Sequence, residues 1–269
     1  MNNQNNFNDH LTLEELNLVF KLMDLLHNKN IDYDEEMFDQ NYLIRFLRSK
    51  NLNLKEAFKM FTNFLKWHEK QSEENEGFDF VELPEILKHH PHGLHKIDKL
   101  GRPIYIEVWG KVDFSKVIKN TSHERLQKYY ITRHENLINN ILPKCSKIAN
   151  KYVGQMCLII DIRDFSLSQI NTDLFKMIEK RSDNYEQYYP DLLGRCNIVS
   201  NSLGFKAIWT IVSAFLSENT KKRVNFYTDD YQNELCKIIE PENLPVFLGG
   251  KCDCNGGCLA INSGPWKEL

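Results

Sequence analysis

The sequence has 269 residues, of which 42% are hydrophobic and 26% are charged, and its formal net charge is -3 at pH 7. These values are ordinary for a globular chain, and the length favours one large lobe with a small accessory unit. The near-neutral charge excludes a general electrostatic attraction to nucleic acid or to anionic membranes, so any anion site has to be local.

The N-terminal segment carries no pattern for export or lipid anchoring. Residues 1–11 begin with MNNQNNFNDH, which lacks the basic and apolar regions of a signal peptide and has Asn2 where myristoylation needs glycine. We expect this asparagine-rich segment to be disordered. Because no apolar run approaches membrane-spanning length, we expect a cytoplasmic protein, and we expect its seven cysteines to be free thiols.

Residues 12–75 have the pattern of a helical module. Thr12 and Glu15 form a capping-box pattern, and apolar residues at helical spacing follow as far as Leu26. A second helix is expected around residues 43–47, and a third begins at Asn53. The polar sequence QSEENEG at residues 71–77 then interrupts the pattern and marks the linker to a second unit, residues 76–269.

In this second unit, short segments rich in β-branched and aromatic residues alternate with helical stretches, which predicts an α/β sheet. The longest helical stretch opens with a capping-box pattern at Thr121. A turn at residues 95–103 leads into the first long strand, so we expect a mixed, mostly parallel sheet. The expected strands are residues 103–109, 156–162, 196–200 and 223–227.

Two groups of residues could bind a metal ion, although the motifs of the common enzyme classes are absent from the sequence. The first group is His89, His90, His92 and His95, which we interpret as an exposed loop because Pro91 and Gly93 interrupt it and no well-spaced cysteine is near.

The second group is Cys252, Cys254 and Cys258, in the sequence KCDCNGGC. Three soft ligands within seven residues could hold a metal ion if a fourth came from elsewhere. Because the paired CxxC spacing is missing, we interpret them as reduced thiols in a glycine-rich tail and expect no metal and no cofactor. A metal-dependent hydrolase that uses either group is a remote alternative.

Residues 204–216, GFKAIWTIVSAFL, form a helical pattern that is apolar on every side. Such a helix is either buried in the core, which the periodicity by itself slightly favours, or is a lid over an apolar cavity. The sequence SENTKKR follows at residues 217–223. This cationic cluster is either a solvated loop or a site where basic side chains beside a hydroxyl hold a phosphate.

Several segments resemble the CRAL-TRIO family, in its phosphatidylinositol transfer protein branch, from about residue 40 onward. The segments are RFLRSKNLNLKEAFKM at 45–60, HKIDKLGRPIYIE at 95–107, YYPDLLGR at 188–195, ENLPVFLGGKC at 242–252 and the tail CDCNGGCLAINSGPW at 252–266. The resemblance implies an N-terminal helical bundle followed by a lobe whose mixed, mostly parallel sheet floors a hydrophobic pocket under a gate helix. The gate falls on Phe205, Ile208, Trp209, Val212 and Phe215.

The resemblance also implies binding residues. The head group of a phosphoinositide would be held by Lys50, Asp191, Thr220 and Arg223. Asn51 and Leu192 stand where the family has basic residues, and Arg223 replaces a lysine, which keeps the charge but changes its geometry.

A second lipid, phosphatidylcholine, would lie against pocket residues His134, Met156, Leu158 and Tyr185. Because Met156 and Leu158 replace hydroxyl-bearing side chains, a buried phosphocholine group would lose hydrogen bonds there. We therefore expect weak or absent phosphatidylcholine binding.

The function implied by the resemblance is that of a monomeric, non-enzymatic carrier. It extracts a phospholipid, phosphatidylinositol, during transient contact with a membrane, and it binds no nucleic acid. One alternative is a carrier of a non-phosphorylated ligand such as a sterol-like, tocopherol-like or retinoid-like molecule. Another is a module that presents the bound lipid to a lipid kinase or other lipid-modifying enzyme.

Overall fold

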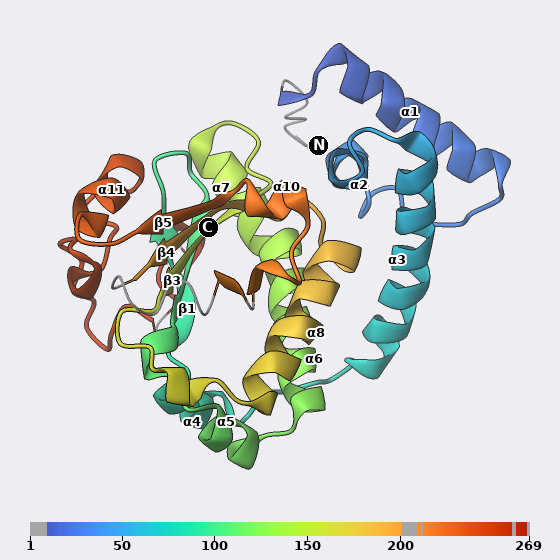
Figure 1. The fold of residues 1–269 in the computed structure, drawn as a ribbon. Coiled ribbons are helices and arrows are strands. Elements are labelled where there is room, and N and C mark those ends of the chain that lie inside the picture. The colour runs from blue at the N-terminus through green and yellow to red at the C-terminus, as the bar shows by residue number, and fades with distance from the viewer. Residues whose placement is uncertain (1–9, 201–208, 211, 260–261, 268–269) are drawn as a thin grey trace. The chain divides into compact units, whose positions relative to one another are not determined.

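The structure is a computed structural model that describes residues 10–200, 209–210, 212–259 and 262–267 (Figure 1). The N-terminal segment expected to be disordered lies outside the described residues, except for residues 10 and 11. The chain forms two compact units. The first contains the described residues up to Phe78 together with Asn184–Leu192, and the second contains Asp79–Asp183 and the described residues from Leu193 onward.

The first unit is built on three helices, α1 (Leu13–Asn28), α2 (Gln40–Ser49) and α3 (Leu54–Glu74). Their starts follow from side-chain caps: the capping box of Thr12 and Glu15 is formed as predicted, and Asn53 accepts a hydrogen bond from the backbone N–H of Glu56. The first residues of the polar segment 71–77 continue α3 to Glu74, so the linker predicted there begins later than its composition suggested.

Aromatic side chains fill the interior of this first unit. Phe46, Phe61 and Phe64 are fully buried, and their ring centroids lie 5.1 to 5.9 Å apart. Residues 184–192 pack in the same unit, where Tyr188 stacks on Trp67 with the centroids 4.0 Å apart. The segment is therefore held by packing against α3, although it is far from α3 in the sequence.

The second unit contains a five-stranded sheet in the order β1-β2-β3-β4-β5. Strand β1 pairs antiparallel with β2, and the other neighbours pair parallel, which confirms the prediction of a mixed, mostly parallel sheet. The strands are β1 (His92–Ile97), β2 (Pro103–Val108), β3 (Met156–Asp161), β4 (Leu193–Val199) and β5 (Val224–Tyr227).

Helices connect the strands and cover both faces of this sheet. The α-helices are α4 (Leu83–His89), α5 (Phe114–Asn120), α6 (His123–Asn136), α7 (Leu142–Ala149), α8 (Thr172–Tyr188), α10 (Glu218–Lys221) and α11 (Tyr231–Ile238). Short 3-10 turns are η2 (Trp109–Lys111), η4 (Leu167–Gln169), η5 (Val246–Leu248) and η6 (Pro265–Lys267).

The long helical stretch starts one residue later than predicted, because Ser122, not Thr121, accepts the capping hydrogen bond. A π-helical turn, η3 (Leu137–Ile141), joins α6 to α7. Pro143 at the start of α7 lacks a backbone N–H, which removes one helical hydrogen bond and accounts for the local change of winding. Among the described residues, no helix has both the length and the apolar character needed to span a bilayer.

The histidine group is not an exposed loop, as the sequence suggested. Strand β1 extends back through Gly93 to His92, and His90, His92 and His95 are all buried. Hydrogen-bond partners outside the local sequence explain the difference: His92 Nε2 lies 2.9 Å from the hydroxyl of Tyr129 on α6. A polar sequence can enter the interior when a distant element supplies such partners.

Candidate functional site

The candidate site is the sheet face that is covered by α8. Because successive side chains of a strand point to opposite faces, the strand register lines up two rows across the sheet. One row joins Tyr105, Leu158, Cys196 and Val224, and the next joins Glu107, Ile160, Ile198 and Phe226. Leu174, Met177 and Ile178 of α8 pack against the apolar members of these rows.

This face is apolar but incompletely covered. Leu158, Ile160, Val224 and Phe226 remain partly exposed, although all pack against one buried cluster. On the opposite face, Ile104, Ile106, Cys157 and Ile159 are each 0% exposed. The partly open face of the sheet therefore presents apolar surface that an apolar ligand could cover, whereas the opposite face is sealed.

The described part of the expected gate segment lies against this open face. The ring of Trp209 meets that of Phe226 edge to face, with the centroids 4.9 Å apart, and Val212 and Phe215 pack on the same cluster. All three gate side chains are partly buried rather than sealed in the core. The other two expected gate residues, Phe205 and Ile208, lie outside the described residues.

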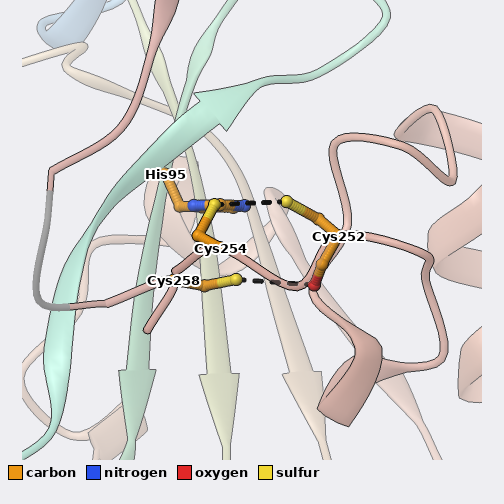
Figure 2. A group of neighbouring side chains, drawn as sticks. All are labelled: His95, Cys252, Cys254 and Cys258. Atoms are coloured by element: carbon orange, nitrogen blue, oxygen red, sulfur yellow. Dashed lines mark hydrogen bonds between the residues drawn. The ribbon is translucent and has the colours of Figure 1, made fainter. Parts of the chain in front are cut away.

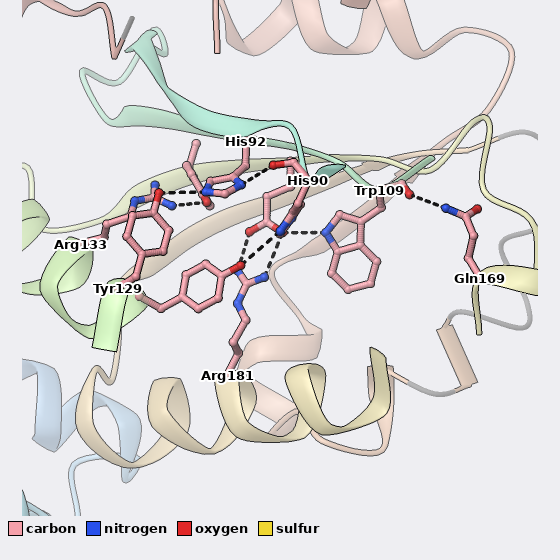
Figure 3. A network of polar contacts seen from close by, with 10 residues as sticks. His90, His92, Trp109, Tyr129, Arg133, Gln169 and Arg181 are labelled. Atoms are coloured by element: carbon pink, nitrogen blue, oxygen red, sulfur yellow. Dashed lines mark hydrogen bonds and ion pairs between the residues drawn. The ribbon is translucent and has the colours of Figure 1, made fainter. Parts of the chain in front are cut away.

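A buried ion pair fixes α8 to the polar part of the same face (Figure 3). Both terminal nitrogens of Arg181 donate to the carboxylate of Glu107, one at 3.0 Å, and the indole N–H of Trp109 donates to it at 2.6 Å. Burial by itself raises the pKa of Glu107, but the charge of Arg181 and its hydrogen bonds to the carboxylate outweigh burial and hold that pKa well below its usual value.

The neighbouring histidines are neutral members of this network. Burial lowers the pKa of His90, despite the opposing effect of Glu107, and lowers that of His92 further. Arg133 donates to the hydroxyl of Tyr105 and lies over its ring, 4.2 Å from the centroid. The carboxylate and both guanidinium groups are engaged with one another or with hydroxyls, an arrangement that positions elements rather than activating a nucleophile.

The predicted pocket residues occupy different places. Leu158 lies on the open sheet face and is partly exposed, whereas Met156, at the start of β3 beside a register shift, is buried. His134 is buried near the end of α6. Tyr185 is half-buried in the last turns of α8, in the part of the chain that belongs to the first unit.

The predicted head-group residues are divided between the two units, each described by itself. In the first unit, Lys50 lines a cavity of about 560 Å³ together with Lys59 and Lys66, which the sequence analysis did not single out. Asp191 takes a left-handed conformation with φ of 57°, and one of its carboxylate oxygens lies 3.9 Å from a terminal nitrogen of Arg48.

In the second unit, Thr220 and Arg223 share one turn, since the Arg223 backbone N–H donates to the Thr220 carbonyl at 3.0 Å. Ser217 caps the short helix α10 and donates its hydroxyl to that of Thr220 at 3.0 Å. The Arg223 guanidinium donates to the carbonyl of Leu193 at the start of β4, which anchors it beside the open face.

The Glu107–Arg181 pair was not predicted from the sequence. A signal was present, because Glu107 is a charged residue in a strand that is otherwise apolar or aromatic. It points to the same sheet face as Tyr105, two residues earlier. A charge at such a position needs a buried partner, but the pattern does not reveal which residue supplies it.

The fold and this face define a helical unit followed by an α/β unit with a partly open apolar sheet. Residues 87–250 match the family model described as the CRAL/TRIO domain, and the chain belongs to this family. The chain of a solved structure titled "Crystal structure of Sfh5" superposes with a TM-score of 0.66 at 13% identity, covering 95% of this chain and 94% of that one. That likeness concerns the fold alone.

Curated relatives cover nearly the whole sequence. The phosphatidylinositol/phosphatidylcholine transfer protein SFH11 of Arabidopsis thaliana is 37% identical over 262 residues, 95% of this chain and 68% of that protein. The Sec14 cytosolic factor of Schizosaccharomyces pombe is 30% identical over 90% of this chain and 85% of its own length. The chain spans only 45% of the plant relative SFH12, at 34% identity over 92% of this chain.

Proposed function

We propose that this chain is a non-enzymatic lipid transfer protein that binds a phospholipid, phosphatidylinositol first, and exchanges it between membranes. The observation that carries the proposal is the partly open apolar face around Leu158, Ile160 and Phe226. The names of the relatives support the class of ligand, because they describe transfer proteins for phosphatidylinositol and phosphatidylcholine.

Acyl chains are the part of a phospholipid that suits this face. Each methylene group that moves from water to an apolar surface contributes about 0.8 kcal/mol, so two long chains supply ample free energy without covalent chemistry. The partly exposed gate residues Trp209, Val212 and Phe215 would cover the chains in the bound state. Loss of one lipid would expose the face again, so exchange is favoured over release of an empty protein.

The head group would be held by Lys50, Asp191, Thr220 and Arg223. A hydrogen bond from a charged donor to a phosphate contributes about 1.5–3 kcal/mol net. In the second unit, the guanidinium of Arg223 would supply such a charged donor and the hydroxyl of Thr220 a neutral one, both within one turn. In the first unit, the cavity at Lys50 is lined by three lysines and by Glu56 and Glu186, so positive charge is only slightly in excess there.

Phosphatidylcholine is the weaker ligand in this proposal. Leu158 on the open face and the buried Met156 offer no hydrogen-bond partner, and a buried polar group left without a partner costs about 1–3 kcal/mol. His134 and Tyr185 would be the remaining polar side chains of the pocket. The protein would work in the cytoplasm and contact membranes transiently, as a monomer, and presentation of the lipid to a lipid kinase would use the same bound state.

The test is lipid extraction and mass spectrometry of protein re-isolated from vesicles that contain phosphatidylinositol, phosphatidylcholine and a sterol. We expect phosphatidylinositol to be enriched in the wild type and lost in Arg223→Glu. The matched charge reversal Lys237→Glu, on α11 at the other side of the sheet, should leave loading unchanged. Equal recovery of phosphatidylcholine or sterol from the wild type and Arg223→Glu would refute the head-group assignment and favour a carrier of neutral ligands.

A further inference from the structure

Four side chains with metal-ligating atoms converge beside β1, away from the proposed lipid face. They are His95, Cys252, Cys254 and Cys258, and their ligand atoms all lie within 4.8 Å of one another (Figure 2). From the sequence we interpreted the three cysteines as ordinary thiols because the paired CxxC spacing is missing. Strand β1 supplies the fourth ligand from a position far away in the sequence.

The spacing of these atoms suits tetrahedral zinc. Zinc–sulfur bonds of about 2.3 Å and zinc–nitrogen bonds of about 2.0–2.1 Å place the ligand atoms of a tetrahedral site roughly 3.5–3.8 Å apart. The Sγ atoms of Cys252 and Cys254 are 3.4 Å apart. A disulfide needs a sulfur–sulfur distance of about 2.05 Å, and all seven cysteines are free thiols in the structure.

The buried imidazole of His95 independently indicates a ligand. His95 is 0% exposed, and neither of its ring nitrogens has a hydrogen-bond partner among the described residues. Leaving a buried polar group unsatisfied is unfavourable, so natural structures rarely do so without a ligand or water. A metal ion would satisfy the ring nitrogen that it bonds.

The backbone holds the three cysteines in place without the ion. The N–H of Cys252 donates to the carbonyl of Leu244 at 3.0 Å, and its carbonyl accepts from Val246 at 3.0 Å. Between Cys254 and Cys258 the chain turns through Gly256 and Gly257, with φ of 88° and 90°, a conformation that other residues adopt with strain. The turn brings Cys258 back, with its Sγ 3.5 Å from the carbonyl oxygen of Cys252.

The C-terminal segment also meets β1 directly. The backbone N–H of Lys96 donates to the carbonyl of Ser263 at 2.6 Å, and a Cβ atom on Gly93 would lie 2.2 Å from the carbonyl oxygen of Leu259. Glycine is therefore required at residue 93 for this close approach. The cluster lies where the C-terminal segment crosses an edge strand of the sheet.

We propose that His95, Cys252, Cys254 and Cys258 bind one Zn²⁺ ion in a closed Cys3His site that fastens the C-terminal segment to β1. Four protein ligands leave no position for a substrate, so the ion is structural. Thiolate ligands favour zinc over magnesium, calcium or manganese, which prefer oxygen. This site replaces the expectation of a metal-free tail and is independent of the lipid that the other sheet face binds.

The experiment is a metal analysis of the full chain purified without chelator from zinc-supplemented medium. We expect about one zinc per chain by inductively coupled plasma mass spectrometry and a loss of most of that zinc in Cys258→Ser and in His95→Gln. The matched control is Cys236→Ser, which removes a half-buried thiol of α11 outside the cluster and should leave the zinc content unchanged.

A measurement on the wild type avoids variants that fail to fold. Protein stripped with a chelator should be titrated with Co²⁺ and then with Zn²⁺. We expect intense visible bands of tetrahedral cobalt with thiolate charge-transfer bands, displaced by one equivalent of zinc, as a closed four-ligand site requires. The proposal fails if purified protein holds no stoichiometric zinc and cobalt gives no such bands, or if mass spectrometry finds a disulfide among the three cysteines.

Discussion

Replacing Glu107 by glutamine should strongly destabilise the second unit. The carboxylate is 1% exposed, and it is the charged partner of Arg181, whose side chain is 15% exposed. Glu107→Gln keeps the shape but leaves the guanidinium buried without a counter-charge. Removing one partner of a buried pair costs about 3–5 kcal/mol.

The magnitude can be read from urea unfolding followed by circular dichroism. With a slope of about 2 kcal/mol per molar urea, the loss lowers the midpoint by roughly 1.5–2.5 M. As a control, Glu85→Gln removes the carboxylate from an exposed pair with Lys88 and should not move the midpoint measurably.

A double variant separates loss of the pair from loss of packing. Glu107→Leu with Arg181→Met replaces both charges by apolar groups, an exchange that is often neutral for buried pairs. We expect the double variant to recover much of the stability that Glu107→Gln loses. The reasoning is refuted if the free energy of unfolding of Glu107→Gln lies within about 0.5 kcal/mol of that of the wild type.

Two further predictions concern acid sensitivity and the two sheet faces. Burial lowers the pKa of His90 and His92, so below about pH 6.5 the unfolded state binds more protons than the folded state. The free energy of unfolding should therefore fall as the pH drops from there. An unchanged urea midpoint between about pH 5 and 7 would contradict this. Leu158→Thr should stay folded and raise phosphatidylcholine loading in the vesicle assay, whereas Ile159→Thr on the sealed face should lower the free energy of unfolding by about 2–4 kcal/mol. If Leu158→Thr and Ile159→Thr lowered the free energy of unfolding equally, the inference that one sheet face is open and the other sealed would be wrong.

The local pattern of the sequence predicted the N-terminal helices, four of the five strands and the family, but not β1. Thr12 and Asn53 cap helices where their spacing to a later glutamate predicted it, because capping depends on residues within one turn. Alternation along β3 places Leu158 and Ile160 on one face and Cys157 and Ile159 on the other, since that alternation is a property of the strand itself. The open face of the candidate site was therefore predictable in part.

Only the tertiary structure decided which distant groups meet. Glu107 and Arg181 are 74 residues apart, and the local sequence around either residue does not predict that the other is its partner. His95 lay in a histidine-rich stretch that predicted a loop, yet in a buried strand it becomes the fourth neighbour of three cysteines. Periodicity reports which side of an element is buried, whereas the partner of a buried charge or imidazole depends on how the elements pack, which is decided by contacts throughout the chain.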